Sequence, residues 1–298
     1  MNAMEQFVRK ILIYIIVPLL LMLPALFGFD YLVKKNAPSF KIPPDISKVF
    51  IGDSHIQCAI NDSIVPHSIN IAISAESFYF SYYKLERLLD VNPSVKHVYL
   101  GFSYHSLSNY YDELIGGDFS SEIAPKYFSI LPLEEQFRML YWNRNSIAPF
   151  VKGIITHGIY QIWFKQYFPY IGGFSDYFKD TSADQLSMDK RLNFQFYNEG
   201  KVNDFSELNI SYLRQIIKLC TSKNVHLTVL KTPLHRYYLN KIPLSYKNKL
   251  GEILKSEKID AIDLEHLKLS DECFIPDGDH VSFLGARKTS IQLKKIIQ

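Results

Sequence analysis

Two short motifs at opposite ends of the chain carry residue types that could do nucleophilic chemistry. Near the N-terminus an apolar run, Lys48–Ile51, is followed by Gly-Asp-Ser at 52–54. Near the C-terminus Asp277 and His280 lie in one short segment. A serine hydroxyl is a weak nucleophile until a general base takes its proton, and a carboxylate must orient that base. Ser54, His280 and Asp277 therefore have the residue types of an acyl-transfer triad.

Two alternatives stay open at these motifs. Ser is a favoured N-cap, so Ser54 could simply cap a helix that begins beside it. If that helix begins at Ser54, its free N–H groups would instead suit a nucleophile whose reaction creates an oxyanion. Asp279, one residue from His280, competes with Asp277 as the orienting carboxylate. The Asp-x-x-His spacing favours Asp277.

The two motifs resemble the first and last sequence blocks of the SGNH hydrolases, the GDSL-like superfamily. Gly52-Asp53-Ser54, Asp277-x-x-His280 and Gly285, five residues after the histidine, match those blocks residue by residue. The resemblance covers roughly residues 46–104 and 205–298. It implies a three-layer α/β/α, flavodoxin-like parallel sheet and ester chemistry through Ser54, His280 and Asp277. We expect no cofactor and no metal, since the other histidines lack metal-ligand spacing.

The middle blocks depart from the family pattern. Where a Gly usually follows the second strand, this chain has Asn-Ile-Ala-Ile-Ser at 70–74, so Ala72 or Ser74 must supply any backbone oxyanion donor. The Asn of the third block is absent, because the strand predicted at 96–103 leads into Gly-Phe-Ser-Tyr-His. Ser103 or His105 is the candidate replacement.

Composition narrows the classes of protein. The chain of 298 residues has 33 basic and 30 acidic residues, a formal net charge of +3, with no long run of one sign. This balance argues against nucleic-acid binding. The three cysteines show no metal-site or framework spacing, so we expect free thiols, with a Cys220–Cys273 bridge as the open alternative.

The N-terminal segment predicts a membrane anchor. Residues 11–29 carry no charge, and a helix of that length would be about 28 Å long, close to the thickness of a hydrocarbon core. Arg9 and Lys10 precede it without a cleavage site behind it, so we expect an uncleaved anchor over 1–35. A proline-containing tether, 36–46, would follow. We expect a single-pass protein of the cell (inner) membrane with the domain, 47–298, on the extracytoplasmic side.

The rest of the chain alternates strand-like and helix-like segments, as in a parallel α/β sheet. Strands are predicted at 48–51, 67–74, 96–103, 225–230 and 261–264. Helices are predicted at 76–90, 205–222 and 245–256, and from about 284. Residues 104–200 lack strand alternation and predict a helical insertion. It is rich in aromatic residues, including 141–142, 163 and 168–170, and we expect it to cover the catalytic edge.

These features predict a membrane-anchored serine esterase or O-acyltransferase. The anchor and the missing Asn are similar to the SGNH-like proteins that assist teichoic-acid D-alanylation and alginate acetylation. That similarity implies an envelope or exported polysaccharide as substrate and a membrane-bound O-acyltransferase as partner. His235 and Arg236 could touch such a substrate. The alternative is a non-catalytic glycan-binding or scaffold protein of an acylation complex.

Overall fold

A five-stranded parallel sheet organises the chain, with strand order β2-β1-β3-β6-β7. Counted along the chain, its strands stand in the order 2-1-3-4-5 of flavodoxin-like folds, as predicted. Each strand lies where the sequence placed it, within a few residues: β1 Lys48–Ile51, β2 Ser68–Asn70, β3 His97–Gly101, β6 His226–Lys231 and β7 Asp260–Asp263. The computed structural model describes residues 3–36, 39–117, 119–164, 171–175 and 181–297.

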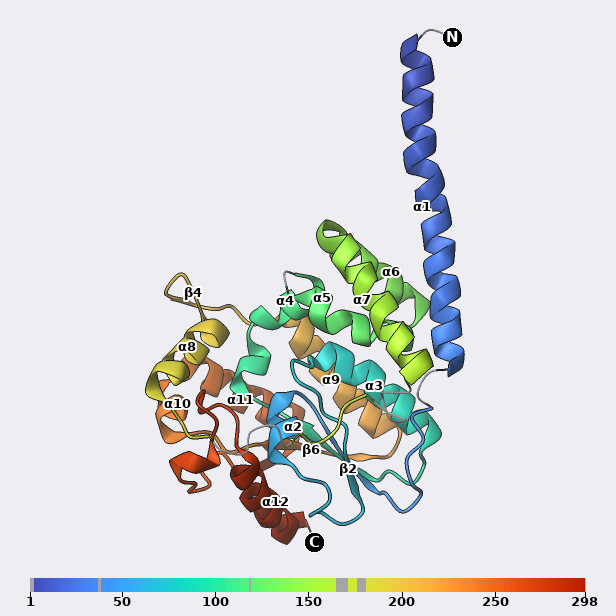
Figure 1. Ribbon diagram of the computed structural model, residues 1–298. Helices are drawn as coiled ribbons and strands as arrows, with labels where there is room; N and C mark the ends of the chain where they lie inside the picture. The colour runs from blue at the N-terminus through green and yellow to red at the C-terminus, as the bar shows by residue number, and fades with distance from the viewer. Residues whose placement is uncertain (1–2, 37–38, 118, 165–170, 176–180, 298) are drawn as a thin grey trace.

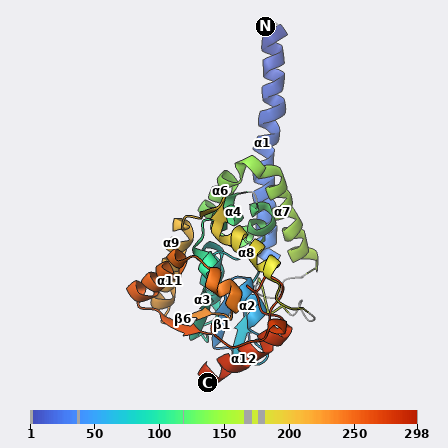
Figure 2. The same ribbon diagram turned by 90° about the vertical axis from the view of Figure 1, so that its left-hand side faces the viewer.

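Helices cover both faces of the sheet because its strands are apolar on both sides. Val49, Val98 and Val229 face one core, whereas Phe50, Tyr99 and Leu230 face the other. Figure 2 shows α9 and α11 on one side of the strands and α2 and α12 on the other. The helices of this layered domain are α2 Ser54–Ala59, α3 Phe78–Val91, α9 Glu207–Ser222, α10 Arg236–Lys241, α11 Leu244–Glu257 and α12 Phe283–Ile297, with a short turn η6 Asp271–Cys273.

The three cysteines are buried free thiols. Cys220 packs in the core beneath α9 and Cys273 in the core beneath α12, on opposite faces of the sheet. The bridge between them that the sequence left open is therefore not formed.

The segment between β3 and α9 is helical in the residues that the structure describes. Its elements are η1 Tyr104–Leu107, α4 Tyr110–Gly116, α5 Ser120–Ile123, η2 Ala124–Lys126, η3 Phe128–Ile130, α6 Leu133–Trp142, η4 Arg144–Ser146, α7 Ile147–Ile159, η5 Tyr160–Phe164 and α8 Gln185–Phe196. A two-stranded hairpin, β4 Tyr197–Asn198 and β5 Lys201–Val202, ends it; the sequence did not predict this hairpin. The aromatic stretch 168–170 lies outside the described residues.

Helix α1, Ala3–Asn36, projects far from the domain at its N-terminal end and packs against it at its C-terminal end (Figure 1). Leu26, Asp30 and Val33 are buried. The Phe27 ring lies 4.9 Å from that of Phe137 on α6, and Asp30 accepts a 2.9 Å hydrogen bond from Gln136. The last turns of the segment predicted as anchor therefore belong to the core of the insertion.

A membrane-spanning helix over 11–29 was predicted, but among the described residues no helix has the length and apolarity to cross a membrane.

The segment predicted as a tether, 36–46, includes residues 37–38, which lie outside the described chain. Phe40 and Ile42 are buried. The Asn92 side chain accepts a 3.0 Å hydrogen bond from the Ile42 N–H and donates one of 2.6 Å to the Phe40 carbonyl. Phe40 and Ile42 therefore pack against the end of α3, while the prolines at 43 and 44 are exposed.

Candidate active site

Ser54 stands at the carboxyl end of β1, at the first residue of α2. Gly52 adopts φ +144°, a conformation that favours glycine, and turns the chain out of the strand. Asp53 is the N-cap of α2, and its Oδ1 accepts a 3.0 Å hydrogen bond from the His55 N–H. Ser54 therefore does not cap the helix, and its hydroxyl is left for another partner.

That partner is His280. Its Nε2 lies 2.7 Å from Ser54 Oγ, and its Nδ1 lies 2.7 Å from Asp277 Oδ2. Burial alone would raise the pKa of Asp277, but His280 outweighs it and holds the pKa below its usual range. An ionised carboxylate only accepts hydrogen bonds, so Nδ1 carries the proton and Nε2 accepts from Ser54. This is the arrangement a general base needs.

Asp277 is fixed by its own loop, whereas Asp279 points elsewhere. Asp277 Oδ1 accepts hydrogen bonds of 3.0 and 3.1 Å from the N–H groups of Asp279 and His280. The Asp279 carboxylate bonds instead to His55, Arg191 and Gln195, at 2.7, 2.9 and 2.8 Å. Of the two carboxylates that the sequence left open, Asp277 is the one bonded to His280.

A buried layer of charge lies directly beneath the triad. The His55 ring stacks on that of His280, with centroids 4.6 Å apart. Its two nitrogens lie 3.2 Å from Asp53 Oδ1 and 2.7 Å from Asp279 Oδ1. Burial would lower the pKa of His55, but Asp279 and Asp53 outweigh it and raise the pKa to about 10. His55 is therefore an imidazolium at neutral pH, held between two carboxylates.

Arg191, on α8, completes this layer. Burial would lower the pKa of its guanidinium, but Asp279 outweighs burial and raises it. His55, and after it Arg191, hold the pKa of Asp279 well below its usual range against the effect of burial. Two cations, His55 and Arg191, thus balance two anions, Asp53 and Asp279. Sequence reasoning missed both cations: His55 is adjacent to Ser54, but nothing in the sequence links Arg191 to position 279.

Two overlapping groups in this layer have the composition of a metal site: Asp53, His55 and His105, and His55, Asp279 and His280. His55 already bonds to a carboxylate through each ring nitrogen. A metal could bind it only after one of these bonds broke and the imidazolium lost its proton. The residues present fit an ion-pair network better than they fit a metal centre.

The two backbone donors expected after β2 are engaged within the protein. The Ala72 N–H donates to Asn70 Oδ1 at 2.9 Å, and the Ser74 N–H donates to Gln57 Oε1 at 2.8 Å. Ala75, one residue further on, is half-buried and lines the same pocket as Ser54. In the part of the chain that the structure describes, its N–H makes no hydrogen bond to protein. Ala75 is thus the better candidate for the backbone donor.

Ala75 adopts φ +62°, a left-handed conformation that costs a non-glycine residue about 1–2 kcal/mol. An ion pair beneath the loop holds it there. The buried Lys84 on α3 bonds to Glu76 and donates to the carbonyls of Ile71, at 2.6 Å, and Ile171, at 3.1 Å. The sequence does not display this positive φ, so sequence reasoning did not single out Ala75.

Neither proposed replacement for the third-block Asn is placed to donate. Ser103 is buried and is not among the residues lining the Ser54 pocket. His105 does line the pocket, but its Nε2 lies 3.3 Å from Asp53 Oδ2. Burial lowers the pKa of His105, so the ring is neutral, and facing a carboxylate its proton resides on Nε2. The other nitrogen then accepts hydrogen bonds rather than donating them to an oxyanion.

The pocket at Ser54 has a volume of about 370 Å³, and the insertion forms much of its wall. Tyr110 and Leu114 from α4, Phe119, and Phe194 from α8 line it opposite the triad. In the described residues the insertion therefore covers the catalytic edge, as expected. His235 is not in this wall. Its ring Nε2 lies 3.2 Å from Asp271 Oδ1, and its backbone N–H donates a 2.9 Å hydrogen bond to the carbonyl of Gly278. His235 therefore supports the loop that carries Asp277 and His280.

The glycine at position 285 has a steric explanation. A Cβ there would lie 2.1 Å from the carbonyl oxygen of Cys273 and 2.8 Å from Cβ of Val281. Only a glycine lets α12 pack this closely against the loop that carries His280.

Comparisons with known proteins give a distant likeness. No protein-family model and no curated protein matches the chain. A GDSL-like lipase from Bacteroides thetaiotaomicron is 11% identical over 86% of this chain and 90% of its own, with a TM-score of 0.38. A protein described as a platelet activating factor from Streptococcus pneumoniae is 13% identical, with both chains covered completely and a TM-score of 0.37.

Proposed function

We propose that the chain is a serine esterase or O-acyltransferase of the SGNH type. The observation that supports this most directly is the unbroken series of hydrogen bonds from Asp277 through His280 to Ser54, at the edge of a pocket. His280 lies between the serine hydroxyl and a carboxylate whose pKa is held below its usual range, which is the arrangement that a general base needs.

The reaction would proceed through an acyl-enzyme. Ser54 Oγ attacks the ester carbonyl while His280 Nε2 takes its proton, and Asp277 stabilises the imidazolium that results. The N–H groups of Ser54 and Ala75 stabilise the negative oxygen of the tetrahedral intermediate. When the C–O bond breaks, the leaving alcohol takes the proton from His280. Water or a sugar hydroxyl then attacks the acyl-enzyme, with His280 again as base.

The substrate we propose is an acyl ester on a cell-envelope or exported polysaccharide. Loss of one oxyanion donor typically costs about 10²–10³ in rate, and this site has no third-block Asn. Small esters provide no remote binding energy to offset that loss, whereas a glycan in the aromatic-walled pocket does. We therefore expect slow turnover of small esters and faster turnover of acylated carbohydrate.

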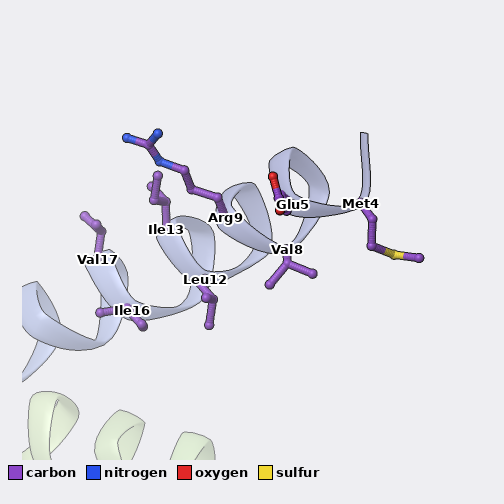
Figure 3. A pocket seen from close by; sticks show the side chains of 8 residues that line it. All are labelled: Met4, Glu5, Val8, Arg9, Leu12, Ile13, Ile16 and Val17. Atoms are coloured by element: carbon purple, nitrogen blue, oxygen red, sulfur yellow. The ribbon is translucent and has the colours of Figure 1, made fainter. Parts of the chain in front are cut away.

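The location at the cell membrane, with the domain outside and a membrane-bound O-acyltransferase as partner, remains part of the proposal. Its support is the exposed apolar surface of the first turns of α1. Figure 3 shows Val8, Leu12 and Ile16 projecting from this helix, and the side chains of Leu12, Leu20 and Leu21 are about half exposed or more. Reporter fusions after Lys41 test it: reporters active only in the cytoplasm would contradict the orientation.

The second candidate is a non-catalytic glycan-binding or scaffold protein, favoured by the engaged Ala72 and Ser74 donors. An active-site serine probe distinguishes the two. We expect a fluorophosphonate to label the purified full-length protein and to spare Ser54→Ala. Ser63→Ala, which changes an exposed serine outside the pocket, is the control and should label like wild type. Labelling that persists in Ser54→Ala, or is absent from wild type, would reject the catalytic function.

A further inference from the structure

A second cavity lies against the outer side of the Ser54 pocket. It has a volume of about 250 Å³ and shares three wall residues with that pocket: Tyr110, Phe119 and Phe194. The Phe194 ring contacts the other two, with centroids 5.4 Å from Tyr110 and 6.1 Å from Phe119. These three rings, which we term the aromatic ridge, separate the two cavities. A ligand that reacts at Ser54 and extends over this ridge would reach the second cavity.

The ridge is accessible to such a ligand. Phe119 is 45% exposed and Phe194 46% exposed, although both are large apolar side chains beside a cavity. Side chains of a core would be covered by other residues. Contact between these exposed apolar rings and water is unfavourable, so a ligand that covers them is stabilised. A sugar ring has an apolar C–H face that can pack on an aromatic ring while its hydroxyls stay hydrated or hydrogen bonded.

The far side of the outer cavity has the polar groups that hydroxyls require. Asn109, Asn198 and Asn203 line it, and each amide can both donate and accept, as a hydroxyl does. The Asn203 amide is held in place, because its Nδ2 donates to Ser108 Oγ at 3.3 Å and to the Gln195 carbonyl at 3.2 Å. A hydroxylated ring can exchange hydrogen bonds with the amides of Asn109 and Asn198 and donate to Oδ1 of Asn203, whereas an apolar acyl chain can do neither.

Charge at the two cavities disfavours anionic ligands. Their ionisable linings include the carboxyl side chains of Glu113, Glu122 and Asp277 and one guanidinium, that of Arg191. Arg191 is already bonded to Asp279. A ligand carrying carboxylates or phosphates on every unit would meet like charge on both sides of the ridge.

We infer that the outer cavity is a sugar-binding subsite, and that the substrate is an O-acylated, uncharged oligosaccharide or polysaccharide with at least two sugar units across the aromatic ridge. One unit carries the ester at Ser54, and its neighbour packs on Phe194 and bonds to the asparagines. This inference rests on the proposed function only in taking Ser54 as the reacting group.

The test measures kcat/KM for O-acetylated gluco- and manno-oligosaccharides of one to four units, and for 4-nitrophenyl acetate. We expect wild type to gain about tenfold or more from one unit to two. Asn198→Ala, an exposed change that reaches only the outer cavity, should lose about three- to tenfold on two units and nothing on 4-nitrophenyl acetate. Phe194→Leu should lose a similar factor on two units. The matched controls are Asn193→Ala, an exposed asparagine of α8, and Phe137→Leu, a half-exposed phenylalanine of α6; neither residue lines the two cavities.

Several outcomes would overturn the inference. One is Ser54-dependent hydrolysis with no dependence on chain length in any of these sugars. Another is an Asn198→Ala effect equal on oligosaccharide and 4-nitrophenyl acetate, and a third is better turnover of acetylated oligomannuronate than of the neutral series. If no ester is turned over, calorimetric binding of the neutral tetrasaccharides to Ser54→Ala decides: binding weakened by Asn198→Ala retains the subsite without the catalytic function, and no binding rejects both.

Discussion

The charge on His55 can be tested by its effect on stability. This ring is buried between Asp53 and Asp279, and its pKa rises from 6.5 to about 10 on folding. Each pKa unit corresponds to 1.36 kcal/mol, so the bound proton stabilises the folded protein by about 5 kcal/mol. Because the folded-state pKa is raised, this stabilisation is complete below pH 6.5 and is lost as the pH rises through about 10.

The assay compares urea unfolding of full-length wild type and His55→Gln in mild detergent at pH 6, 8 and 9.5. The difference in unfolding free energy between the two proteins removes the contribution of every group that titrates alike in both. We expect the stability advantage of wild type to shrink by about 1.4 kcal/mol per pH unit between pH 7 and 9.5. His266→Gln, which changes an exposed histidine, is the control and should show no such slope.

A second measurement does not depend on the variant folding. Histidine ring NMR signals of wild type should show one imidazole that stays protonated at pH 8, and that signal should be absent from His55→Gln. A stability difference that does not change with pH, together with a neutral His55 ring at pH 8, would refute the charged layer beneath the triad.

Three further predictions concern the residues that position the site. Asp277→Asn should keep the fold and lower kcat on aryl acetate by about 10³–10⁴, because an amide no longer fixes the His280 tautomer; near-wild-type turnover would contradict this role. Gly285→Ala should lower stability by more than about 2 kcal/mol through backbone overlap, whereas Gly251→Ala, where a Cβ meets nothing within 4 Å, should stabilise α11 by up to about 1 kcal/mol; equal melting temperatures would disprove the steric argument. Lys84→Met should cost about 3–5 kcal/mol in urea unfolding by leaving Glu76 buried and unpaired, and adding Glu76→Leu should restore most of it; additive losses would show that the pair does not act as a unit.

Local patterns in the sequence predicted the sheet and the two ends of the site. Alternating apolar runs and helical periodicity are set by residues close in the chain, so the five strands and the four longer domain helices lie near their expected ranges. The Asp277–His280 contact is likewise local, since only two residues of one loop separate the partners. The contact of Ser54 with His280 could be predicted only from the resemblance to the SGNH hydrolases, because the two motifs lie at opposite ends of the chain.

Only the tertiary structure decided which atoms of the site are available for chemistry. Asp279 does not orient His280 because α8 brings Arg191 and Gln195 to it. Ala75 is the better candidate donor because the N–H groups of Ala72 and Ser74 are already bonded within the protein. The packing of α1 onto the insertion and the polar cavity beyond the aromatic ridge also join segments far apart in sequence. Composition and periodicity determine which face of an element is apolar, but hydrogen-bond partners and backbone angles depend on what else the folded chain places within a few ångströms.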